Sequence, residues 1–446
     1  MTRAAVGAGV ALTGAALGVA VSLTMTLPGS LAPAATGALV LLGIFLLWPW
    51  TVLPVGIVGG ATVGALVSGG DVRSYVAIHL ALLAVGGTAV LVRRGLNLGG
   101  RRRRTPADRA MLVVAGLSVV AAGAGLAIGN PPADVVVAAY QIAVIPIYFL
   151  LATYTLDTPR RLVAAGLLYV GMLAVLVAAS MTAPGRHGGL LTLLAAPPLI
   201  WAAGRTRGWR RAAAVLVAGL FTIDVVLAAY RGIWLAAGTT LLVMLVFGGR
   251  AVRTGLAATA AVGAAGGVLL AFVPGVAQRA GEIVAELHQS AGYRASESTV
   301  GLDVFTRWPI LGAGLGQSTA DVYLSGFART DVGPVYHAFY VTLLANVGLV
   351  GLILVLWPVL RGIRAGLADR DGLALPFAAL CCGFLGAAMF AAPTDGHWEL
   401  GLLPALVLLS TPHRPPSDQA PPERHGPPPP RHRRSGAPVR IPAVTC

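Results

Sequence analysis

Apolar residues run through this chain in long blocks that short polar segments separate. A block of about 20 residues crosses the hydrocarbon core of a bilayer as an α-helix. The pattern therefore predicts an all-α polytopic membrane protein with about 12–14 transmembrane helices. We interpret the first block as a span, because it is too long for the apolar region of a signal peptide. The predicted spans cover residues 4–27, 31–47, 51–68, 74–92, 110–128, 135–155, 162–180, 189–203, 212–230, 233–248, 254–273, 336–360, 372–392 and 399–410.

One long interruption divides the apolar blocks, and the chain ends in a segment of different composition. We expect residues 1–273 to form an N-terminal transmembrane bundle and residues 336–410 to form the C-terminal transmembrane helices. Between them lies a large loop, residues 274–335, whose regular apolar spacing predicts short helices, one of them ending at Pro309. Residues 411–446 carry eleven prolines and six arginines with few apolar side chains, which predicts a disordered tail in the cytoplasm.

Composition argues against a soluble enzyme. Of the 446 residues, 56% are hydrophobic and only 11% are charged, and the mean hydropathy is +0.79. A soluble domain carries roughly a quarter charged residues, because its surface must be solvated. All 32 basic residues are arginine, and the formal charge is +15. In so apolar a chain we expect this charge to face anionic membrane lipids, and we expect no binding to nucleic acid.

The arginines separate into two sets when successive loops are assigned alternately to the two sides of the membrane. With Arg3 placed inside, 25 of the 32 arginines fall on that side. Cytoplasmic loops collect basic residues, so this partition predicts an even number of spans with both termini in the cytoplasm. The protein is then expected in the cytoplasmic (inner) membrane with its large loop extracytoplasmic. The arginines on the outer side are Arg73, Arg186, Arg231, Arg279, Arg294, Arg307 and Arg329.

Two of these outer arginines and one histidine are candidates for chemistry. Arg231 stands between two spans, seven residues after Asp224, so that a continuous helix would place both on one face. Such an arginine either extends to the membrane interface or binds a phosphate bidentately. Arg294 stands three residues before Glu297, and a loop arginine beside a glutamate is normally a solvated ion-pair partner. His337 opens the next span, where a histidine is either structural or a general base at neutral pH.

Other polar residues have ordinary explanations. The glycines of residues 312–316 are spaced too closely for a dinucleotide-binding motif. We interpret Asp395, His397 and Glu399 as a surface cluster in a short outer turn, and His79 as a packed or pore-facing polar residue. Because the sequence contains no metal-binding or phosphate-binding motif, we expect neither a metal nor another cofactor.

Several motifs, taken in their order along residues 215–360, resemble the O-antigen ligase/polymerase family of membrane glycosyltransferases. That family has an arginine-glycine pair at a span junction, a glycine-rich segment in a large outer loop, and a histidine before a glycine-containing span. Ala338 departs from the pattern, which often has asparagine at that position. The matching segments are Tyr230-Arg-Gly-Ile-Trp-Leu-Ala, Phe305-Thr-Arg-Trp-Pro-Ile-Leu-Gly-Ala-Gly-Leu-Gly-Gln317, His337-Ala-Phe-Tyr and Gly348-Leu-Val-Gly351.

The resemblance implies a GT-C-like helical fold that transfers a polyprenyl-diphosphate-linked glycan on the outer face of the membrane, without a metal. The acceptor is a hydroxyl of a glycan or a lipid, so a ligase and a polymerase both stay open. By the same resemblance, Arg231 and Arg294 bind the diphosphate, and His337 activates the acceptor hydroxyl for an inverting attack. The residues expected to support this site are Asp224, Arg307 and Tyr336.

Two other function classes stay open. A transporter or flippase of lipid-linked glycans would carry ionisable residues through several spans, whereas Asp224 and His79 are nearly alone in the predicted spans. A non-catalytic component of a polysaccharide-export complex is favoured mainly by the proline-rich tail.

Overall fold

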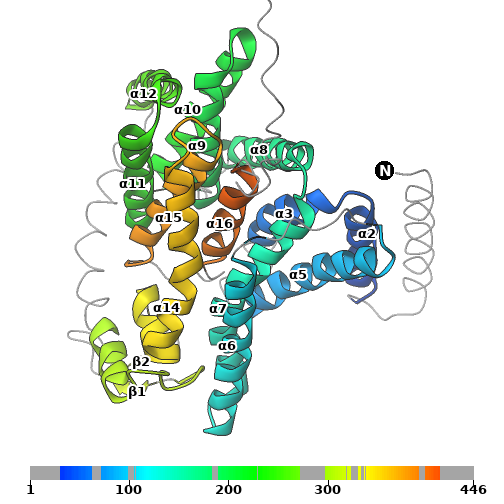
Figure 1. The fold of residues 1–446 in the computed structure, drawn as a ribbon, viewed down its shortest axis with the longest axis vertical. Helices are drawn as coiled ribbons and strands as arrows, with labels where there is room; N and C mark the ends of the chain where they lie inside the picture. Colours follow the sequence, from blue (N-terminus) through cyan, green and yellow to red (C-terminus); the bar gives the residue numbers. More distant parts are fainter. Residues whose placement is uncertain are drawn as a thin grey trace, which may run out of the picture. The chain divides into compact units, whose positions relative to one another are not determined.

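The computed structural model is helical, as the apolar blocks predict (Figure 1). Every described residue belongs to one compact unit, which ends at Thr411. The predicted span 4–27 and the proline-rich tail lie outside the described residues. The structure describes residues 31–62, 72–98, 105, 107–182, 189–228, 230–271, 297–317, 319–322, 330–332, 336, 338–390 and 397–411.

The apolar blocks fold into helices whose ends lie close to the predicted limits. Apolar blocks of this length form helices readily, because a helix satisfies its own backbone hydrogen bonds in lipid. The helices are α2 (Leu31–Leu47), α5 (Val72–Gly95), α6 (Asp108–Ala127), α7 (Pro132–Thr155), α8 (Pro159–Thr182), α9 (Gly189–Arg205), α10 (Gly208–Leu227), α11 (Arg231–Phe247), α12 (Arg250–Ala271), α14 (Phe339–Leu367), α15 (Ala374–Ala387) and α16 (Glu399–Ser410).

Within the part of the chain that the structure describes, five helical segments are long and apolar enough to cross a membrane, by length and composition. Several other apolar helices are shorter, and a 17-residue helix such as α11 reaches only about 25 Å, near the lower limit for a span. The chain is therefore a multi-pass membrane protein. The five segments are Val76–Gly95, Asp108–Ala127, Pro132–Thr155, Pro159–Ala178 and Phe339–Leu367.

The block predicted as a span over residues 51–68 departs from a regular helix. It contains a 3-10 turn, η1 (Pro49–Thr51), a single turn α3 (Val52–Pro54) and a π-helical turn η2 (Val55–Gly59). Proline lacks the amide hydrogen that a regular helix needs, so Pro54 interrupts the hydrogen-bond pattern at the point where the helix type changes.

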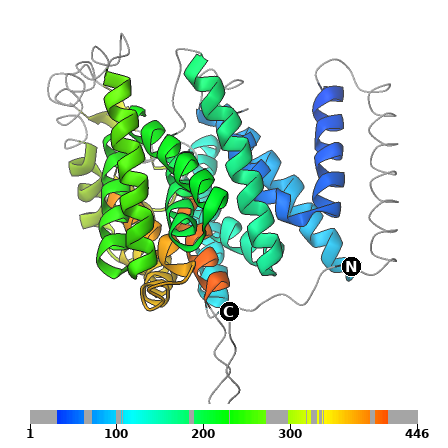
Figure 2. The same ribbon diagram turned by 90° about the horizontal axis from the view of Figure 1, so that it is seen from above.

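Helices that are distant in the sequence form the interior. α7 packs against α16, and α14, α15 and α16 pack against one another, while α9, α10 and α12 form a second group and α11 packs against α15. Figure 2 shows α10 to α12 (green) and α2 (dark blue) on opposite sides of these central helices. Small residues allow the closest approach. A Cβ atom added to Gly401 of α16 would lie 1.9 Å from the carbonyl oxygen of Ile145 in α7.

The large loop contains both helix and strand. Residues 297–307 are helical, which confirms the short helix predicted to end at Pro309. Two strands, β1 (Thr319–Val322) and β2 (Thr330–Val332), pair antiparallel in a sheet that the all-α prediction did not include. Threonine and valine favour strands, but segments of three and four residues are too short for a sequence pattern to reveal them.

A glycine-rich turn, residues 309–317, packs its backbone against α14. Helix α14 is broken at Gly348, whose φ of 64° and ψ of −168° are not helical. The turn supplies the hydrogen-bond partners that the broken helix lacks. Amides of Ala313, Gly314, Leu349 and Val350 donate to the carbonyls of Ala345, Asn346, Pro309 and Ile310, respectively.

The other side of the turn packs against the junction of α6 and α7. The amide of Leu315 donates to the carbonyl of Ala121 at 3.3 Å, and the side chain of Asn130 donates to the carbonyl of Leu315 at 2.8 Å. Gly312 has a φ of 71°, and a Cβ atom there would lie 2.4 Å from the backbone of Asn346. The closely spaced glycines therefore serve backbone packing between α14 and the α6–α7 junction.

We expect Gly312→Ala to destabilise the protein by about 2–5 kcal/mol, because it adds a left-handed backbone penalty to a steric clash. The matched control is Gly129→Ala. Gly129 also has a positive φ, 87°, but an added Cβ atom would meet nothing within 4 Å. The control should cost only the backbone penalty, about 1–2 kcal/mol. Thermal unfolding in detergent, followed by tryptophan fluorescence, measures the stability of both variants. Equal losses of stability in Gly312→Ala and Gly129→Ala would contradict the close contact between Gly312 and α14.

Candidate active site

Asp224 and Arg231 flank the junction between α10 and α11. Asp224 is fully buried near the end of α10, and the hydroxyl of Thr192 in α9 donates a hydrogen bond to its Oδ2 atom at 2.9 Å. A buried carboxylate in an apolar bundle is costly unless polar neighbours satisfy it. The three helices α9, α10 and α11 therefore meet around a polar centre at this junction.

Arg231 is the first residue of α11. Its Nη2 atom is buried and has no hydrogen-bond partner in the part of the chain that the structure describes. The N-terminus of a helix carries a partial positive charge, which favours an anion beside it. The indole nitrogen of Trp234 donates to the carbonyls of Val225 and Val226 at 3.1 and 3.2 Å, which ties the start of α11 to the end of α10. The junction thus holds a buried guanidinium atom that no described residue uses as a hydrogen-bond donor.

Tyr336 and Glu297 form a second buried polar group, between the loop helix and the start of α14. Both residues are buried, and the amide of Tyr336 donates to the hydroxyl of Thr342 at 3.0 Å. Burial, and secondly the carboxylate of Glu297, raise the pKa of Tyr336 to about 12. The phenol therefore stays protonated at neutral pH and can donate a hydrogen bond. Glu297 is itself buried, and its expected partner Arg294 lies outside the described residues.

Arg307, expected as a supporting residue, lies on the exposed face of the loop helix. It forms an ion pair with Asp303 one turn earlier, at 2.6 Å, and both side chains are more than half exposed. Exposed pairs of this spacing contribute little to stability. In this arrangement Arg307 is an ordinary surface arginine.

A histidine–glutamate pair, His397 and Glu399, is buried at the start of α16. His397 Nδ1 lies 2.5 Å from Glu399 Oε1, and the two residues are 2% and 1% exposed. The other carboxylate oxygen, Oε2, is buried and has no hydrogen-bond partner among the described residues. The ring of His397 packs against Phe339, the first residue of α14, with a centroid distance of 4.4 Å. Phe339 follows His337 by two residues in the chain.

The interpretation of Asp395, His397 and Glu399 as a surface cluster is wrong for the last two. They are buried because α16 packs against α7, α14 and α15, and this packing encloses the residues that precede the helix. Asp395 lies outside the described residues. One feature of the sequence could have indicated this burial: His397 and Glu399 flank Trp398 at the start of an apolar helix.

His79 is a packed polar residue, as one of the two interpretations expected. Its Nε2 atom lies 2.6 Å from the hydroxyl of Tyr148, and its Nδ1 atom hydrogen-bonds the hydroxyl of Tyr140. A neutral imidazole has one donor and one acceptor, so one tyrosine donates and the other accepts. Tyr148 in turn packs on Trp398 with a centroid distance of 5.2 Å, which links this buried group to the segment of His397.

His337 and Arg294, the expected base and second phosphate ligand, lie outside the described residues. Of the other expected residues, the structure brings Asp224 and Arg231 to one helix junction and buries Tyr336 beside Glu297. No group of three or more histidine, cysteine or carboxylate side chains that could hold a metal ion occurs within the described ranges. The His397–Glu399 pair is the functional candidate that the sequence interpretation missed.

The chain matches no family model and no curated protein sequence. The resemblance to the O-antigen ligase/polymerase family therefore stays a prediction carried by the motifs themselves.

We expect Glu399→Ala to destabilise the protein by about 3–5 kcal/mol, because it leaves His397 buried without its partner. Glu399→Gln keeps an acceptor for His397 and should cost less. Asp303→Ala, which removes the exposed pair with Arg307, is the matched control and should cost at most about 1 kcal/mol. Thermal unfolding in detergent ranks the variants. If Glu399→Ala were as stable as the control, the buried pair would have no structural role.

Proposed function

We propose that this protein is a membrane glycosyltransferase that transfers or polymerises a polyprenyl-diphosphate-linked glycan onto an acceptor hydroxyl, in the manner of an O-antigen ligase or polymerase. The observation that carries this proposal is Arg231, whose buried Nη2 atom has no partner in the described residues and stands at a helix N-terminus. A guanidinium in this setting is suited to bind a phosphate oxygen. The ordered motifs around it support sugar transfer as the reaction.

The proposed reaction moves one glycan and one proton. His337 takes the proton of the acceptor hydroxyl, and the oxygen forms a bond to the anomeric carbon of the donor. The bond from that carbon to the diphosphate oxygen breaks, and its electron pair leaves with the polyprenyl diphosphate, so that the anomeric configuration inverts. Arg231 and Arg294 stabilise the negative charge that develops on the diphosphate.

His397 and Glu399 are proposed as positioning residues for this chemistry. His397 is 2% exposed and therefore reaches an acceptor only through another group. Its ring contacts Phe339 at the start of α14, next in the chain to the segment that carries His337. A carboxylate that holds an imidazole fixes the tautomer and the orientation of that ring. We expect the pair to orient the start of α14.

The proposed architecture is GT-C-like, with 12–14 spans in the cytoplasmic membrane, both termini inside and the large loop outside. Contacts among three arginine-bearing turns support this sidedness. The indole of Trp201 and the guanidinium of Arg205, at the end of α9, donate to the carbonyl of Asp371, and the amide of Gly249 donates to the carbonyl of Arg370. These turns follow α9, α11 and α14, and all of them are predicted to lie in the cytoplasm.

A flippase or an export component would bind the same donor without forming a glycosidic bond. The buried ionisable groups His79 and Asp224 are each hydrogen-bonded within the bundle, by tyrosines and by Thr192 respectively. This arrangement favours a structural role over an ion pathway through the membrane. A transfer assay separates these functions directly.

We expect His337→Ala to lower the rate of glycan transfer at least about 100-fold, because it removes the base that takes the acceptor proton. Donor binding should stay close to that of the wild type. The measurement is formation of the glycosidic product in proteoliposomes that contain purified lipid-linked donor and acceptor. A fully active His337→Ala protein would refute the catalytic assignment. Donor translocation without product would instead identify a flippase.

We expect Arg231→Ala to weaken donor binding about 10- to 100-fold, the effect of losing a hydrogen bond to a charged group. Arg294→Ala should act in the same direction. Arg210→Ala, which removes an exposed arginine at the start of α10, is the matched control and should leave binding unchanged. The measurement is donor affinity in detergent. Unchanged affinity in Arg231→Ala would refute the diphosphate assignment, whatever the role of His337.

A further inference from the structure

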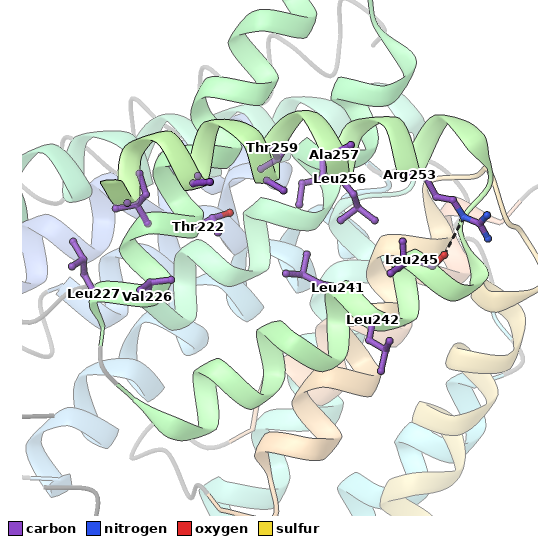
Figure 3. Close-up of a pocket in the computed structure, with 16 residues that line it drawn as sticks. Thr222, Val226, Leu227, Leu241, Leu242, Leu245, Arg253, Leu256, Ala257 and Thr259 are labelled. Atoms are coloured by element: carbon purple, nitrogen blue, oxygen red, sulfur yellow. Dashed lines mark hydrogen bonds between the residues drawn. The ribbon is translucent and has the colours of Figure 1, made fainter. Parts of the chain in front are cut away.

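An apolar groove runs between α10, α11 and α12, with one wall residue from α9 (Figure 3). Its volume is about 570 Å³. Leu227 and Val226 lie at one end, and Arg253 and Leu245 lie at the other (Figure 3). Aliphatic side chains line most of its length, among them Ile223, Leu241, Leu242, Leu256 and Ala260.

A basic cavity of about 580 Å³ adjoins the groove at its Arg253 end. The two share Arg253 and Ala257, and the basic cavity is also lined by Arg250 and Arg370. Arg253 is held in place, because its Nε and Nη2 atoms donate to the carbonyls of Leu245 and Val246 at 3.1 and 3.4 Å. Three guanidinium groups therefore surround the point where the groove ends.

The charge at this end is net positive. Two carboxylates of the described residues belong to the turn beside it: Asp371, which a Cβ atom added to Gly249 would contact, and Asp369, next to Arg370 in the chain. Asp371 lies 4.0 Å from Arg205, a fourth arginine outside both cavities. Arg205, Arg250, Arg253 and Arg370 together outnumber these two carboxylates, so the charge stays net positive. An anion is therefore favoured among these three side chains.

We propose that the groove and the basic cavity form a binding site for one anionic glycerophospholipid. Its phosphate lies among Arg250, Arg253 and Arg370, and an acyl chain lies along the groove. From Arg253 to Gly267 the groove follows α12 for about 21 Å, which is longer than half of the roughly 30 Å hydrocarbon core. The groove is thus long enough to take one acyl chain from the headgroup region to beyond the bilayer centre.

This site is separate from Arg231 and does not depend on the proposed function. Arg231 begins α11, whereas Arg253 binds the carbonyls of Leu245 and Val246 at the end of α11. Leu245 lies 14 residues after Arg231 in α11, so the helix places the two arginine sites about 21 Å apart. A lipid with its phosphate at Arg253 therefore belongs to the opposite leaflet from a ligand at Arg231.

The test is native mass spectrometry of the delipidated full chain, titrated with phosphatidylglycerol or with phosphatidylcholine of the same acyl chains. We expect one phosphatidylglycerol to bind more tightly than phosphatidylcholine. Arg250→Gln and Arg370→Gln should each weaken it about fivefold. Gly263→Leu should weaken it by filling the groove, since an added Cβ atom there meets nothing within 4 Å. Arg253 is left intact because it also binds the end of α11.

Two matched controls keep the result specific. Arg210→Gln removes an exposed arginine outside both cavities, and Gly171→Leu adds the same bulk on α8, where a Cβ atom also meets nothing within 4 Å. Both should bind phosphatidylglycerol as the wild type does. Equal binding of the two lipids, or equal losses in controls and site variants, would overturn the proposal. Displacement of phosphatidylglycerol by a lower concentration of undecaprenyl phosphate would overturn the glycerophospholipid assignment and identify a polyprenyl phosphate as the occupant.

Discussion

The backbone contact between the glycine-rich turn and the broken helix α14 is the interaction on which the candidate site depends. In lipid, a break in a helix exposes amides and carbonyls that only protein can satisfy. Residues 309–317 satisfy the groups around Gly348 and reach the α6–α7 junction on their other side. The loop helix, residues 297–307, directly precedes the turn. It packs against Tyr336, because a Cβ atom added to Gly301 would lie 3.1 Å from the Tyr336 ring. The loop, the start of α14 and the bundle form one structure.

Two buried ionisable side chains elsewhere in the bundle are hydrogen-bonded across helices. Asp224 accepts from a threonine of α9, and His79 of α5 is held by two tyrosines of α7. Among the described side chains that hold a buried atom without a hydrogen-bond partner, Arg231 and Glu399 are the charged ones. An unpaired buried polar group costs free energy unless a ligand or water completes it. Arg231 begins α11 and Glu399 begins α16. Their separate positions are consistent with separate roles, Arg231 in binding an anion and Glu399 in orienting the imidazole of His397.

Most described helices could be predicted from the sequence to within a few residues, because long apolar blocks have few alternatives in lipid. However, α14 ends at Leu367 where 360 was expected, and α15 ends at Ala387 where 392 was expected. The expected block 110–128 is α6, and the block 399–410 is α16 with identical limits. The π-helical turn before Gly60 and the two short strands could not be predicted, since each depends on a few residues. The burial of His397 and Glu399 was missed for another reason. A histidine and a glutamate in a short turn resemble a solvated pair, and only the meeting of α7, α14 and α16 encloses them.

The hydrogen bond from Asn130 to Leu315 joins positions 185 residues apart. A ribosome synthesises α6 and α7 long before it reaches the turn that fills the space between them and α14. Until the chain has passed Gly348, the polar edge of the α6–α7 junction must pair with water or with temporary neighbours. Contacts of such long sequence separation form late and slowly. The order of synthesis thus makes the contact between the turn, α14 and the α6–α7 junction one of the last steps of folding, so that chains truncated before Gly348 have the earlier helices but not this contact.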